Sequence, residues 1–391
     1  MSRRTILGIV AEYDPFHNGH LLHLTESIRR VRPDSTYIAL SPCFKQRGDL
    51  SVLSPLDRAA CAVKCGADAV FALPVLWTVR DAEHYALGAV AMLSGLGITH
   101  LAFGAETADL PALNSAAALL EDPPETFQER LREALSSGSG YPAALCAAAS
   151  SVSAESGAIL SSPNNILAVC YLRAIRKLEA EITPVPVQRS GAYHDPAVQP
   201  DSPSASAIRG ALYRGAYAHV SGAVPACTAE ILSKRFLDSC VPDPAVADTL
   251  LLSTLRDPSM AFDRLPDISE GLDTALKAAS VSASGRSDLI RILSGKRYPA
   301  ARISRLSAMA LLRVDREKVD SLPLPSVTML LAMRKNPEMT SGWKDLPVRI
   351  CASFPEWRNL ADPEDLAAWR IWALAAGAPD TLPFTEKILS V

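Results

Sequence analysis

The sequence has no apolar run long enough to cross a bilayer and no segment typical of a cleavable export signal. A membrane-spanning helix needs roughly 18 or more consecutive apolar residues, and none of the apolar runs in this chain approaches that length. The start, MSRRTILGIVAEYDPF, joins basic residues to a short apolar stretch, but Glu12 and Asp14 follow where a signal peptide has small residues for cleavage. We therefore expect a soluble, cytoplasmic protein.

The sequence also lacks a strong net charge, paired cysteines and internal repeats of solenoid length. Its formal charge of -3 excludes a globally basic nucleic-acid-binding protein, so any contact with RNA requires a local basic patch. The eight cysteines are scattered without C-x-x-C pairs, and several lie inside apolar runs. This distribution favours buried, reduced thiols over a metal site or a disulfide framework.

What the sequence does contain is an alternation of short apolar runs with helical patterns over its first half. This alternation is typical of a parallel sheet covered by helices on both faces. Strands are predicted in TILGIVAEY, TYIALSP, ADAVFALPV, THLAFGAE and ITPVPVQRS, and helices at about residues 19–31, 55–65, 82–96, 109–136 and 163–179. The chain of 391 residues, 48% of them apolar, is long enough for two or three domains and too apolar to be disordered.

The pattern changes near residue 225, after which no convincing strand pattern appears. Helix-period segments follow at 227–240, 244–256, 271–282, 286–295 and 302–313. We therefore predict a Rossmann-like α/β domain with a parallel sheet at residues 1–225, followed by an all-helical domain at residues 226–391. The tryptophans Trp343, Trp357, Trp369 and Trp372 are expected in the core of this second part.

Polar or glycine-containing loops follow all five predicted strands. They read DPFHNGH, SPCFKQRGD, LPVLWTVRDAEH, FGAE and RSGAYHD. In an open parallel sheet, ligands bind beyond the carboxyl ends of the strands, so these loops predict one composite site. The segment 191–202, rich in Pro, Ser and Asp, is expected to be a loop before the next helix.

The most informative motif is H-x-G-H, formed by His17, Asn18, Gly19 and His20 at the start of the first helix. Backbone N–H groups and the positive end of the helix dipole meet there, which suits a triphosphate, and two imidazoles add donors. In adenylyl transfer, charge builds on departing pyrophosphate, and each preplaced donor lowers the barrier by roughly 3 kcal/mol. The alternatives are that the two histidines cap the helix, or that they bind a metal together with His23.

A second motif is PSASAIR at residues 203–209. Ser204 and Ser206 offer hydroxyls at a helix start, and Arg209 offers a fixed positive fork that can close on phosphates from the opposite side. Capping serines and a solvated arginine are the simpler interpretation of this segment alone. Together with H-x-G-H, the segment favours phosphate binding.

With both motifs in view, the chain resembles the nucleotidyltransferase superfamily. More narrowly, GIVAEYDPFHNGHLLHL, FKQRGD, ALPVLWTVRDAEHYALGAV, LAFGAE, SPNNILAVCYL, QRSGAYHD and SASAIR resemble, in order, the bacterial tRNA(Met) cytidine acetate ligase family. The resemblance implies activation of acetate by ATP as acetyl-adenylate, then acetylation of N4 of the wobble cytidine of elongator tRNA(Met). It further implies an ATP-binding catalytic domain at 1–225 and a tRNA-binding role for 226–391.

The resemblance also implies site residues. His17 and His20 are the expected catalytic residues, Phe44, Gln46 and Arg47 belong to a loop at the mouth of the site, and Mg²⁺ is expected with ATP. The expected ATP contacts are Val10, Ala11, Glu12, Tyr13, Asp14, Pro15, Phe16, His17, Asn18, Gly19, His20, Leu21, Leu22, Gly104, Asn164 and Arg189, joined by Ser204, Ser206 and Arg209.

Two positions depart from the family pattern. Asp14 stands where Asn is frequent, which adds a negative charge near the triphosphate that Mg²⁺ can balance. Pro42 replaces a glycine expected after Ser41, and this change bears on the shape of the acyl pocket. Neither change affects the H-x-G-H donors.

A local basic patch is predicted in the helical part. Residues 226–391 are neutral as a whole, with 21 basic and 21 acidic side chains, but residues 286–318 carry a net charge of +6. Within this segment Lys296, Arg297, Arg302 and Arg305 are expected to contact RNA, and Tyr298 to stack on an unpaired base. The alternative is that these Lys and Arg side chains are simply solvated on helix faces and that Tyr298 packs on Pro299.

The main hypothesis is thus an ATP-dependent ligase that modifies tRNA. The runner-up is an adenylyltransferase that acts on a small phosphate-bearing metabolite. A third hypothesis, from another class, is a non-catalytic RNA-binding protein that retains a nucleotide site.

Overall fold

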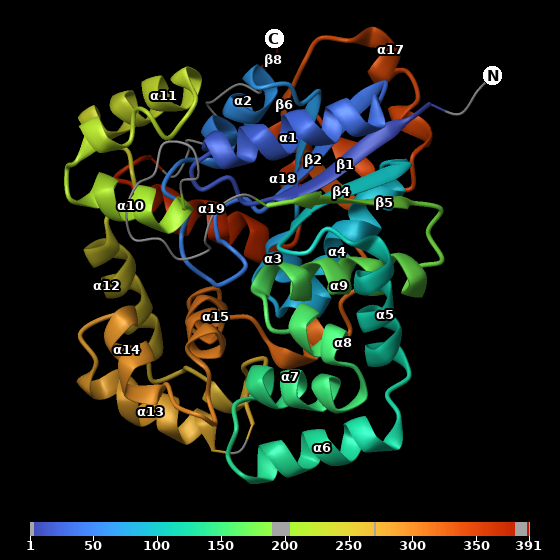
Figure 1. Cartoon of the computed structure of the whole chain (residues 1–391). Helices are drawn as coiled ribbons and strands as arrows, with labels where there is room; N and C mark the ends of the chain where they lie inside the picture. The colour runs from blue at the N-terminus through green and yellow to red at the C-terminus, as the bar shows by residue number, and fades with distance from the viewer. Residues whose placement is uncertain (1–3, 190–203, 270, 380–388, 391) are drawn as a thin grey trace.

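A mostly parallel sheet forms the centre of the molecule (Figure 1). In the computed structural model, which describes residues 4–189, 204–269, 271–379 and 389–390, the strand order is β5-β4-β1-β2-β3-β6-β7, and β8 pairs with β6. The strands are β1 (Ile6–Ala11), β2 (Ser35–Leu40), β3 (Ala69–Ala72), β4 (His100–Ala105), β5 (Thr183–Gln188), β6 (Val327–Met333), β7 (Arg349–Cys351) and β8 (Leu389–Ser390). Because β1 to β5 pair in parallel, the predicted strands and the α/β fold class are confirmed.

The order of the strands creates a switch point beside β1. From β1 the chain adds β2 and then β3 on one side, and it then returns to place β4 and β5 on the other side. The loops at the carboxyl ends of β1 and β4 therefore lead to opposite sides of this point. Open α/β sheets bind their ligands at such a switch point.

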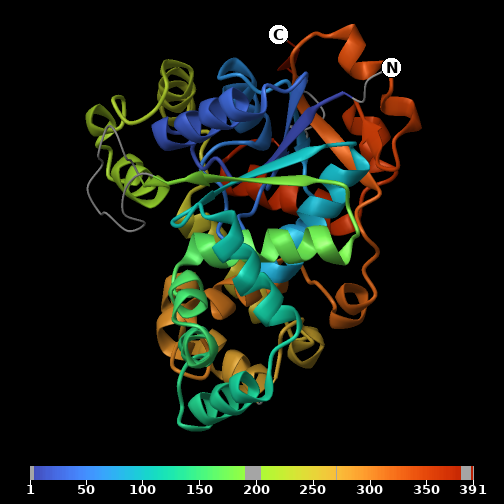
Figure 2. The same cartoon turned by 45° about the vertical axis from the view of Figure 1, so that its right-hand side comes forward.

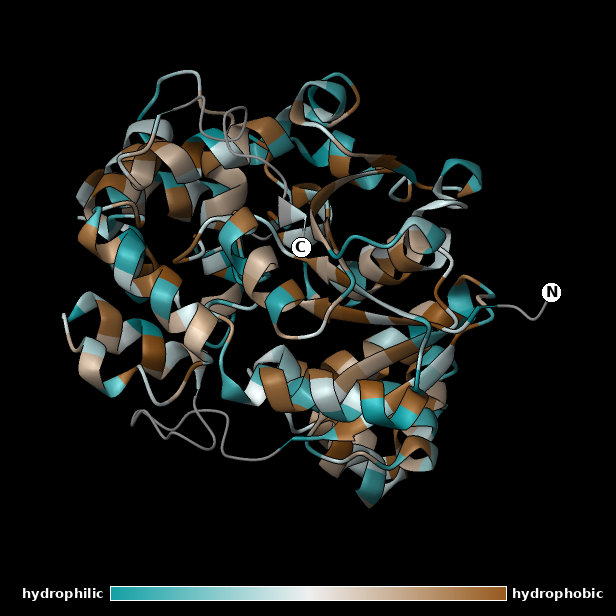
Figure 3. Cartoon of the chain, turned by 90° about the horizontal axis from the view of Figure 1, so that it is seen from above, coloured by the Kyte–Doolittle hydropathy of each residue, from teal (hydrophilic) through white to brown (hydrophobic). Residues whose placement is uncertain are grey.

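Helices cover both faces of the sheet (Figure 2), and alternating strand residues supply a hydrophobic core on each face. Leu7, Ile9 and Ile38 pack in the core that includes α1 (Asn18–Val31) and α2 (Pro55–Lys64). Their neighbours in sequence face the other core, which includes α4 (Ala82–Gly95), α5 (Leu110–Glu121) and α9 (Pro163–Lys177). Figure 3 shows that the covering helices carry both hydrophobic and hydrophilic residues, as expected between core and solvent.

One predicted helix is wrong. The single helix expected at 109–136 is two helices, α5 and α6 (Glu125–Ser136), because Pro123 and Pro124 interrupt it and proline has no N–H to continue the ladder. The remaining helices of this part are α3 (Val75–Thr78), α7 (Tyr141–Val152) and α8 (Ala154–Ile159). The predicted loop at 191–202 and the polar residues of RSGAYHD beyond Arg189 lie outside the described residues.

The C-terminal part is mostly helical, as predicted. Its helices are α11 (Ala226–Leu237), α12 (Pro244–Leu255), α13 (Leu272–Ser282), α14 (Arg286–Leu293), α15 (Ala300–Leu311), α16 (Arg316–Asp320), α17 (Pro337–Thr340), α18 (Phe354–Arg358) and α19 (Pro363–Ala375), with short 3-10 turns at Phe262–Arg264 and Trp343–Asp345. Before residue 226 lie α10 (Ala205–Tyr213) and a 3-10 turn at Tyr217–His219. Trp357, Trp369 and Trp372 are buried, which confirms their core placement. No helix in the described ranges is long and apolar enough to cross a membrane.

The expectation that this part contains no strand is wrong. β6 pairs antiparallel with β3 and so extends the first sheet, with a register shift between Val70 and Phe71. A short, continuous apolar run such as VTMLLAM fits a buried strand and a buried helix equally well by periodicity. The flanking prolines, Pro323 and Pro325 before it and Pro337 after it, were the signals that favoured a strand.

α19 also bears on the pH dependence of stability. Asp365 in α19 accepts the N–H of Val75 at 2.6 Å, and burial raises the pKa of Asp365 to about 7. Since the folded protein holds this proton more tightly than the unfolded chain, whose Asp pKa is about 3.9, stability is lost as the pH rises through about 7. We expect Asp365→Asn, whose amide oxygen still accepts that N–H, to raise the free energy of unfolding by about 2–4 kcal/mol near pH 8 and to change it little near pH 4. Urea denaturation at both pH values checks this, and an equal effect at both would contradict it.

Candidate active site

The two histidines of H-x-G-H form a reciprocal cap at the start of α1. Nδ1 of His17, the N-cap residue, accepts the backbone N–H of His20 at 3.3 Å, and Nδ1 of His20 accepts the backbone N–H of His17 at 3.3 Å. The rings stack with their centroids 3.6 Å apart and their planes 17° from parallel. The capping role left open by the sequence is therefore real, but it occupies only one nitrogen of each ring.

The cap fixes where each ring carries its proton. A ring nitrogen that accepts an N–H is unprotonated, so a neutral imidazole bonded in this way carries its proton on Nε2. Burial, with Arg189 and Arg209 nearby, lowers the pKa of His17 to about 3. Burial, with His17 and Arg189 nearby, lowers the pKa of His20 well below its ordinary value. Both rings are thus neutral near pH 7, with their Nε2–H groups at the positive end of a helix, and the His20 ring also has a hydrogen bond with the backbone of Pro15.

One glycine and two aromatic residues surround the His17 and His20 rings and fix their positions. A Cβ atom at Gly19 would lie 3.0 Å from Cε1 of His17, so glycine lets that ring fold back over the helix start. Tyr13 and Phe16 are buried, and their rings lie 4.9 and 5.9 Å from the His20 ring, centroid to centroid. These two residues hold the histidines from below, as part of the core.

Across the switch point, three predicted residues lie side by side. A Cβ atom at Gly104, near the end of β4, would lie 3.1 Å from Cγ of Arg189, so glycine makes room for the arginine. Arg189 donates to Oδ1 of Asn164 at 3.5 Å, and Nδ2 of Asn164 donates to Glu106 at 2.6 Å. Glu106 also accepts the N–H of Asn165 at 2.9 Å in the first turn of α9. The structure therefore brings Gly104, Asn164 and Arg189 together beside the histidines.

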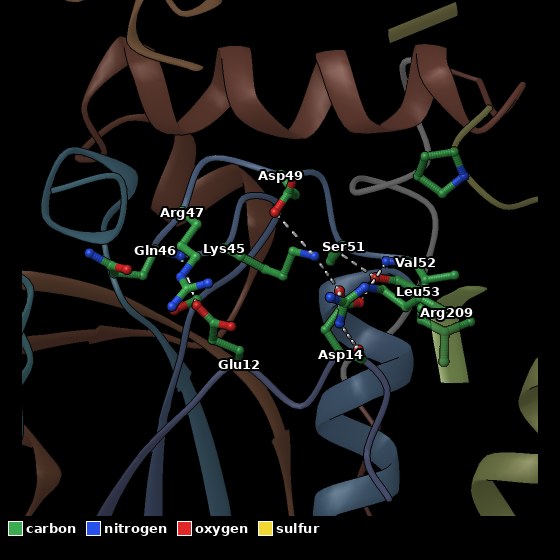
Figure 4. A network of polar contacts seen from close by, with 12 residues as sticks. Glu12, Asp14, Lys45, Gln46, Arg47, Asp49, Ser51, Val52, Leu53 and Arg209 are labelled. Atoms are coloured by element: carbon green, nitrogen blue, oxygen red, sulfur yellow. Dashed lines mark hydrogen bonds and ion pairs between the residues drawn. The ribbon is translucent and has the colours of Figure 1, made fainter. Parts of the chain in front are cut away.

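The negative charge of Asp14 is balanced within the protein. Asp14 is 1% exposed, and its Oδ2 lies 3.1 Å from Nζ of Lys45 and 3.4 Å from the Arg209 guanidinium (Figure 4). Oδ1 accepts the N–H of Val52 at 2.6 Å. Burial alone would raise the pKa of Asp14, but Lys45, Arg209 and Arg58 together hold it below its ordinary value. The carboxylate is therefore ionised, and two cations of the protein provide the balance for which the sequence suggested Mg²⁺.

Arg209 connects the PSASAIR motif to the loop that carries the H-x-G-H motif. Its Nη1 donates to the backbone oxygen of Asp14 at 2.7 Å, which places a guanidinium at the H-x-G-H loop. Ser204 is the N-cap of α10 and accepts the N–H of Ala207 at 3.1 Å, while Ser204 and Ser206 have their hydroxyl oxygens 3.2 Å apart. Ser204 thus has the capping role expected of it, whereas Arg209 is brought to the site.

Arg58 is a further residue of the site, and it was not predicted from the sequence. This arginine in α2 is 0% exposed and donates to the backbone oxygens of Glu12 at 2.5 Å and Ser41 at 2.9 Å, and it also contacts that of Pro42. It therefore ties the loops after β1 and β2 together beneath the site. An arginine on a helix is usually solvated, and the only signal was the apolar stretch AACAV that follows it in α2.

The loop after β2 is held by the helical part. The N–H of Gln46 donates to Glu12 at 2.8 Å, and the hydroxyl of Ser304 in α15 donates to the backbone oxygen of Arg47 at 2.6 Å. Arg286 in α14 donates to the same oxygen at 3.1 Å and contacts Asp49. Phe44 is buried, so of the three residues expected at the mouth only Gln46 and Arg47 remain near the surface.

The other predicted ATP contacts differ in position. Asn18 donates through its backbone N–H to Ala223 at 3.0 Å and through its side chain to Gly222 at 2.9 Å. Leu22, 54% exposed, lies on the outer side of α1, where a contact with ATP is harder to make. For the whole set, contact with ATP stays a prediction.

Many Lys and Arg side chains of the predicted RNA-binding patch have ion-pair or hydrogen-bond partners inside the protein. Within 286–318, at least six do, namely Arg286, Arg291, Arg302, Arg313, Arg316 and Lys318. Arg302 donates to the backbone oxygen of Asp267 at 2.5 Å, and Arg297 and Arg302 both lie over the Tyr298 ring. Lys296 and Arg297 are exposed at the surface. The patch that can meet an anionic partner is therefore smaller than the net charge suggested.

Comparison with known proteins adds to this geometry. The chain matches the HIGH Nucleotidyl Transferase family over residues 4–340. A tRNA(Met) cytidine acetate ligase of Kosmotoga olearia is 34% identical over 326 residues, covering 81% of this chain and 76% of that protein. One of Thermoanaerobacter sp. is 32% identical over 381 residues, covering 95% of each. This chain belongs to the tRNA(Met) cytidine acetate ligase family.

Solved structures show the same likeness to this ligase family. Thermotoga maritima TmcAL bound with alpha-thio ATP superposes with a TM-score of 0.89 at 26% identity, covering 99% of this chain and 100% of that one. The apo form superposes with a TM-score of 0.91 at 27% identity, covering 99% of each. The resemblance seen in the sequence is confirmed, and with it an ATP-dependent ligase on a nucleotidyltransferase fold.

Proposed function

We propose that this ligase joins acetate to ATP as acetyl-adenylate and then acetylates N4 of the wobble cytidine of elongator tRNA(Met). The observation that carries the proposal is the meeting of His17 and His20, two neutral Nε2–H donors, with Arg189 and Arg209 at the switch point. Four donors of this kind match a triphosphate whose charge shifts toward pyrophosphate during the reaction.

In the first step, a carboxylate oxygen of acetate attacks the α-phosphorus, and the bond to the bridging oxygen of pyrophosphate breaks. Negative charge grows on the leaving group, where the two Nε2–H donors and the Arg209 guanidinium bind it more tightly than in ATP itself. In the second step, N4 of cytidine attacks the acetyl carbon, AMP departs with the bonding electrons, and N4 loses a proton. No covalent intermediate with the protein is needed.

Buried polar atoms without partners in the described structure support a ligand at this site. Nε2 of His23 and the hydroxyl of Tyr13 are both buried without a hydrogen-bond partner. Both residues adjoin the stacked histidines in the fold, and a buried unsatisfied polar atom is costly unless a ligand or water completes it. Mg²⁺ is proposed as a companion of the ATP phosphates, because it binds phosphate oxygens together with water.

Two measurements on purified protein test the proposal. We expect labelled pyrophosphate to exchange into ATP only when acetate is present, and mass spectrometry to find one added acetyl group on a cytidine of tRNA(Met). A stable adenylylated metabolite with no effect of tRNA would instead favour a metabolite adenylyltransferase. Binding of ATP and tRNA without transfer from any carboxylate would favour a non-catalytic protein.

We further propose that tRNA enters along the start of α15. The basic segment Lys296 to Arg305 leads into this helix, whose backbone touches the mouth loop, since a Cβ atom at Gly48 would lie 2.7 Å from the backbone oxygen of Ser304. A strand bound at Lys296 and Arg297 is thereby directed toward Arg47 and the site beyond it. Tyr298 is half-buried, with the guanidinium carbons of Arg297 and Arg302 at 5.6 and 5.8 Å from its ring centroid, and it is proposed to offer its ring to an unpaired base.

Replacing both Lys296 and Arg297 by alanine is expected to weaken tRNA binding about tenfold and to lower the slope of log affinity against log salt by about 1–2. The acetate-dependent exchange, which needs no tRNA, should keep its rate. Filter binding over a range of salt concentrations measures the affinity for tRNA and its dependence on salt. The control is Lys344→Ala, an exposed lysine elsewhere in the C-terminal part. Equal weakening by the control would contradict the proposed path.

A further inference from the structure

Three cysteines meet where α2 packs against α11. Sγ of Cys65 lies 3.5 Å from Sγ of Cys227, and Cys61, one turn earlier in α2, shares a hydrogen bond with the Cys227 thiol. Cys61 is fully buried, whereas Cys65 and Cys227 are partly exposed. The bidentate pair of Arg235 with Asp57, at 2.8 and 2.9 Å, joins the same two helices. The two partly exposed thiols therefore face each other across a well-defined interface.

The surroundings favour a reactive thiol at Cys227. It is the second residue of α11, where the positive end of the helix dipole favours a thiolate. Hydrogen bonds from Cys61 and Cys65 lower the pKa of Cys227. A groove of about 220 Å³ opens between the same helices and is lined by Asp57, Lys64, Glu230, Ile231, Lys234 and Arg235. Its three basic and two acidic side chains leave a small positive charge, which suits an approaching small molecule that carries carboxylates.

The interface is connected to the nucleotide site by a short length of chain. Gly222 and Ala223, which accept two hydrogen bonds from Asn18 in the H-x-G-H motif, lie only a few residues before Cys227. A disulfide needs its sulfur atoms about 2.05 Å apart, closer than the 3.5 Å seen between the thiols. A disulfide that draws the start of α11 toward α2 would carry the segment that holds Asn18 with it.

We propose that Cys65 and Cys227 form an oxidisable pair whose disulfide shifts the segment bound to Asn18 and weakens ATP binding. The oxidant is a small disulfide of the glutathione class. The Cys227 thiolate attacks one of its sulfur atoms and expels one thiolate, which leaves a mixed disulfide. Cys65 then gives up its proton to solvent and attacks the Cys227 sulfur, which expels the second thiolate. The two cysteines lose two electrons in total, and the small disulfide becomes two thiols.

The test treats the whole protein with oxidised glutathione and maps disulfides by peptide mass spectrometry without reduction. We expect a Cys65–Cys227 link, lost in Cys227→Ser and in Cys65→Ser and kept in the matched control Cys240→Ser, whose partly exposed thiol lies outside the cluster. Calorimetry with a non-hydrolysable ATP analogue is expected to show about tenfold weaker binding to the oxidised protein, restored by dithiothreitol.

Three results would overturn the proposal. They are the absence of any Cys65–Cys227 link after treatment, a link formed between other cysteines in its place, and a link that leaves the affinity for the analogue unchanged. The serine variants, treated in the same way, separate this effect from glutathione attached elsewhere. The mapping does not depend on catalysis, so it distinguishes failure of this proposal from failure of the proposed ligase reaction.

Discussion

Replacing His17 by asparagine is expected to leave α1 folded and to reduce the exchange of pyrophosphate into ATP by about 10²–10³-fold. Asparagine is a good N-cap, and its side-chain oxygen can accept the His20 N–H as Nδ1 of His17 does. It has no counterpart of the Nε2–H donor, and loss of one such donor typically costs this factor in rate. The variant thus separates the two roles that the sequence left as alternatives.

The measurements are thermal unfolding and the initial rate of acetate-dependent exchange. His219→Asn, an exposed histidine in the short turn before α11, is the matched control and is expected to keep full activity. If the His17→Asn protein exchanges pyrophosphate at the parent rate, then His17 only caps the helix and takes no part in the reaction. His17→Ala should lose both activity and about 1 kcal/mol of stability, because it removes the cap as well.

The second large effect is expected at Lys45. Replacement by methionine, which has a similar length, leaves the buried Asp14 without its closest cation and should lower the free energy of unfolding by about 3 kcal/mol. Adding Asp14→Asn should recover most of this loss, because the asparagine oxygen can still accept the Val52 N–H and no longer carries a charge. Urea denaturation of the two single variants and the double variant measures the coupling, and Lys177→Met, at an exposed lysine of α9, is the control.

The same pair predicts a pH dependence. The pKa of Asp14 is held below its ordinary value, so its contribution to stability is present above the unfolded pKa of about 3.9 and lost as the pH falls through the folded pKa. The double variant should therefore lose stability less steeply in acid than the parent. Additive effects of the two substitutions, with no recovery, would show that Lys45 and Asp14 do not act as a pair.

Much of the fold could be predicted from local patterns. The five parallel strands and the H-x-G-H helix are each specified by a short contiguous stretch, and a parallel sheet fixes which of their ends meet. That is why the loops that carry Gly104 and Arg189, far apart in sequence, could be placed at one edge of the sheet in advance, whereas Asn164 was assigned to the site by the family resemblance alone. β6 was harder to recognise, because the flanking prolines are its only local signal and its place in the sheet depends on the free edge of β3.

The charged network of the site could not be predicted from the sequence either, because its members are brought together only by the fold. Asp14 was noticed as a departure, but its partner Lys45 lies in another loop and reads as an ordinary surface lysine until burial is known. Arg58 is likewise hidden, because its partners are backbone oxygens that carry no signature in the sequence. Conversely, the charge of the basic segment was overestimated, since a count of charges takes no account of intramolecular partners such as Asp257 for Arg313.

The pairing of β6 with β3 has a consequence for synthesis on the ribosome. The chain emerges from its N-terminus, so the edge of β3 stays open until residues up to Met333 have left the exit tunnel. The mouth loop likewise waits for Arg286 and Ser304. We expect nascent chains that end before β6 to need protection by chaperones against edge-to-edge aggregation, and the finished enzyme to gain its ability to consume ATP only near the end of translation.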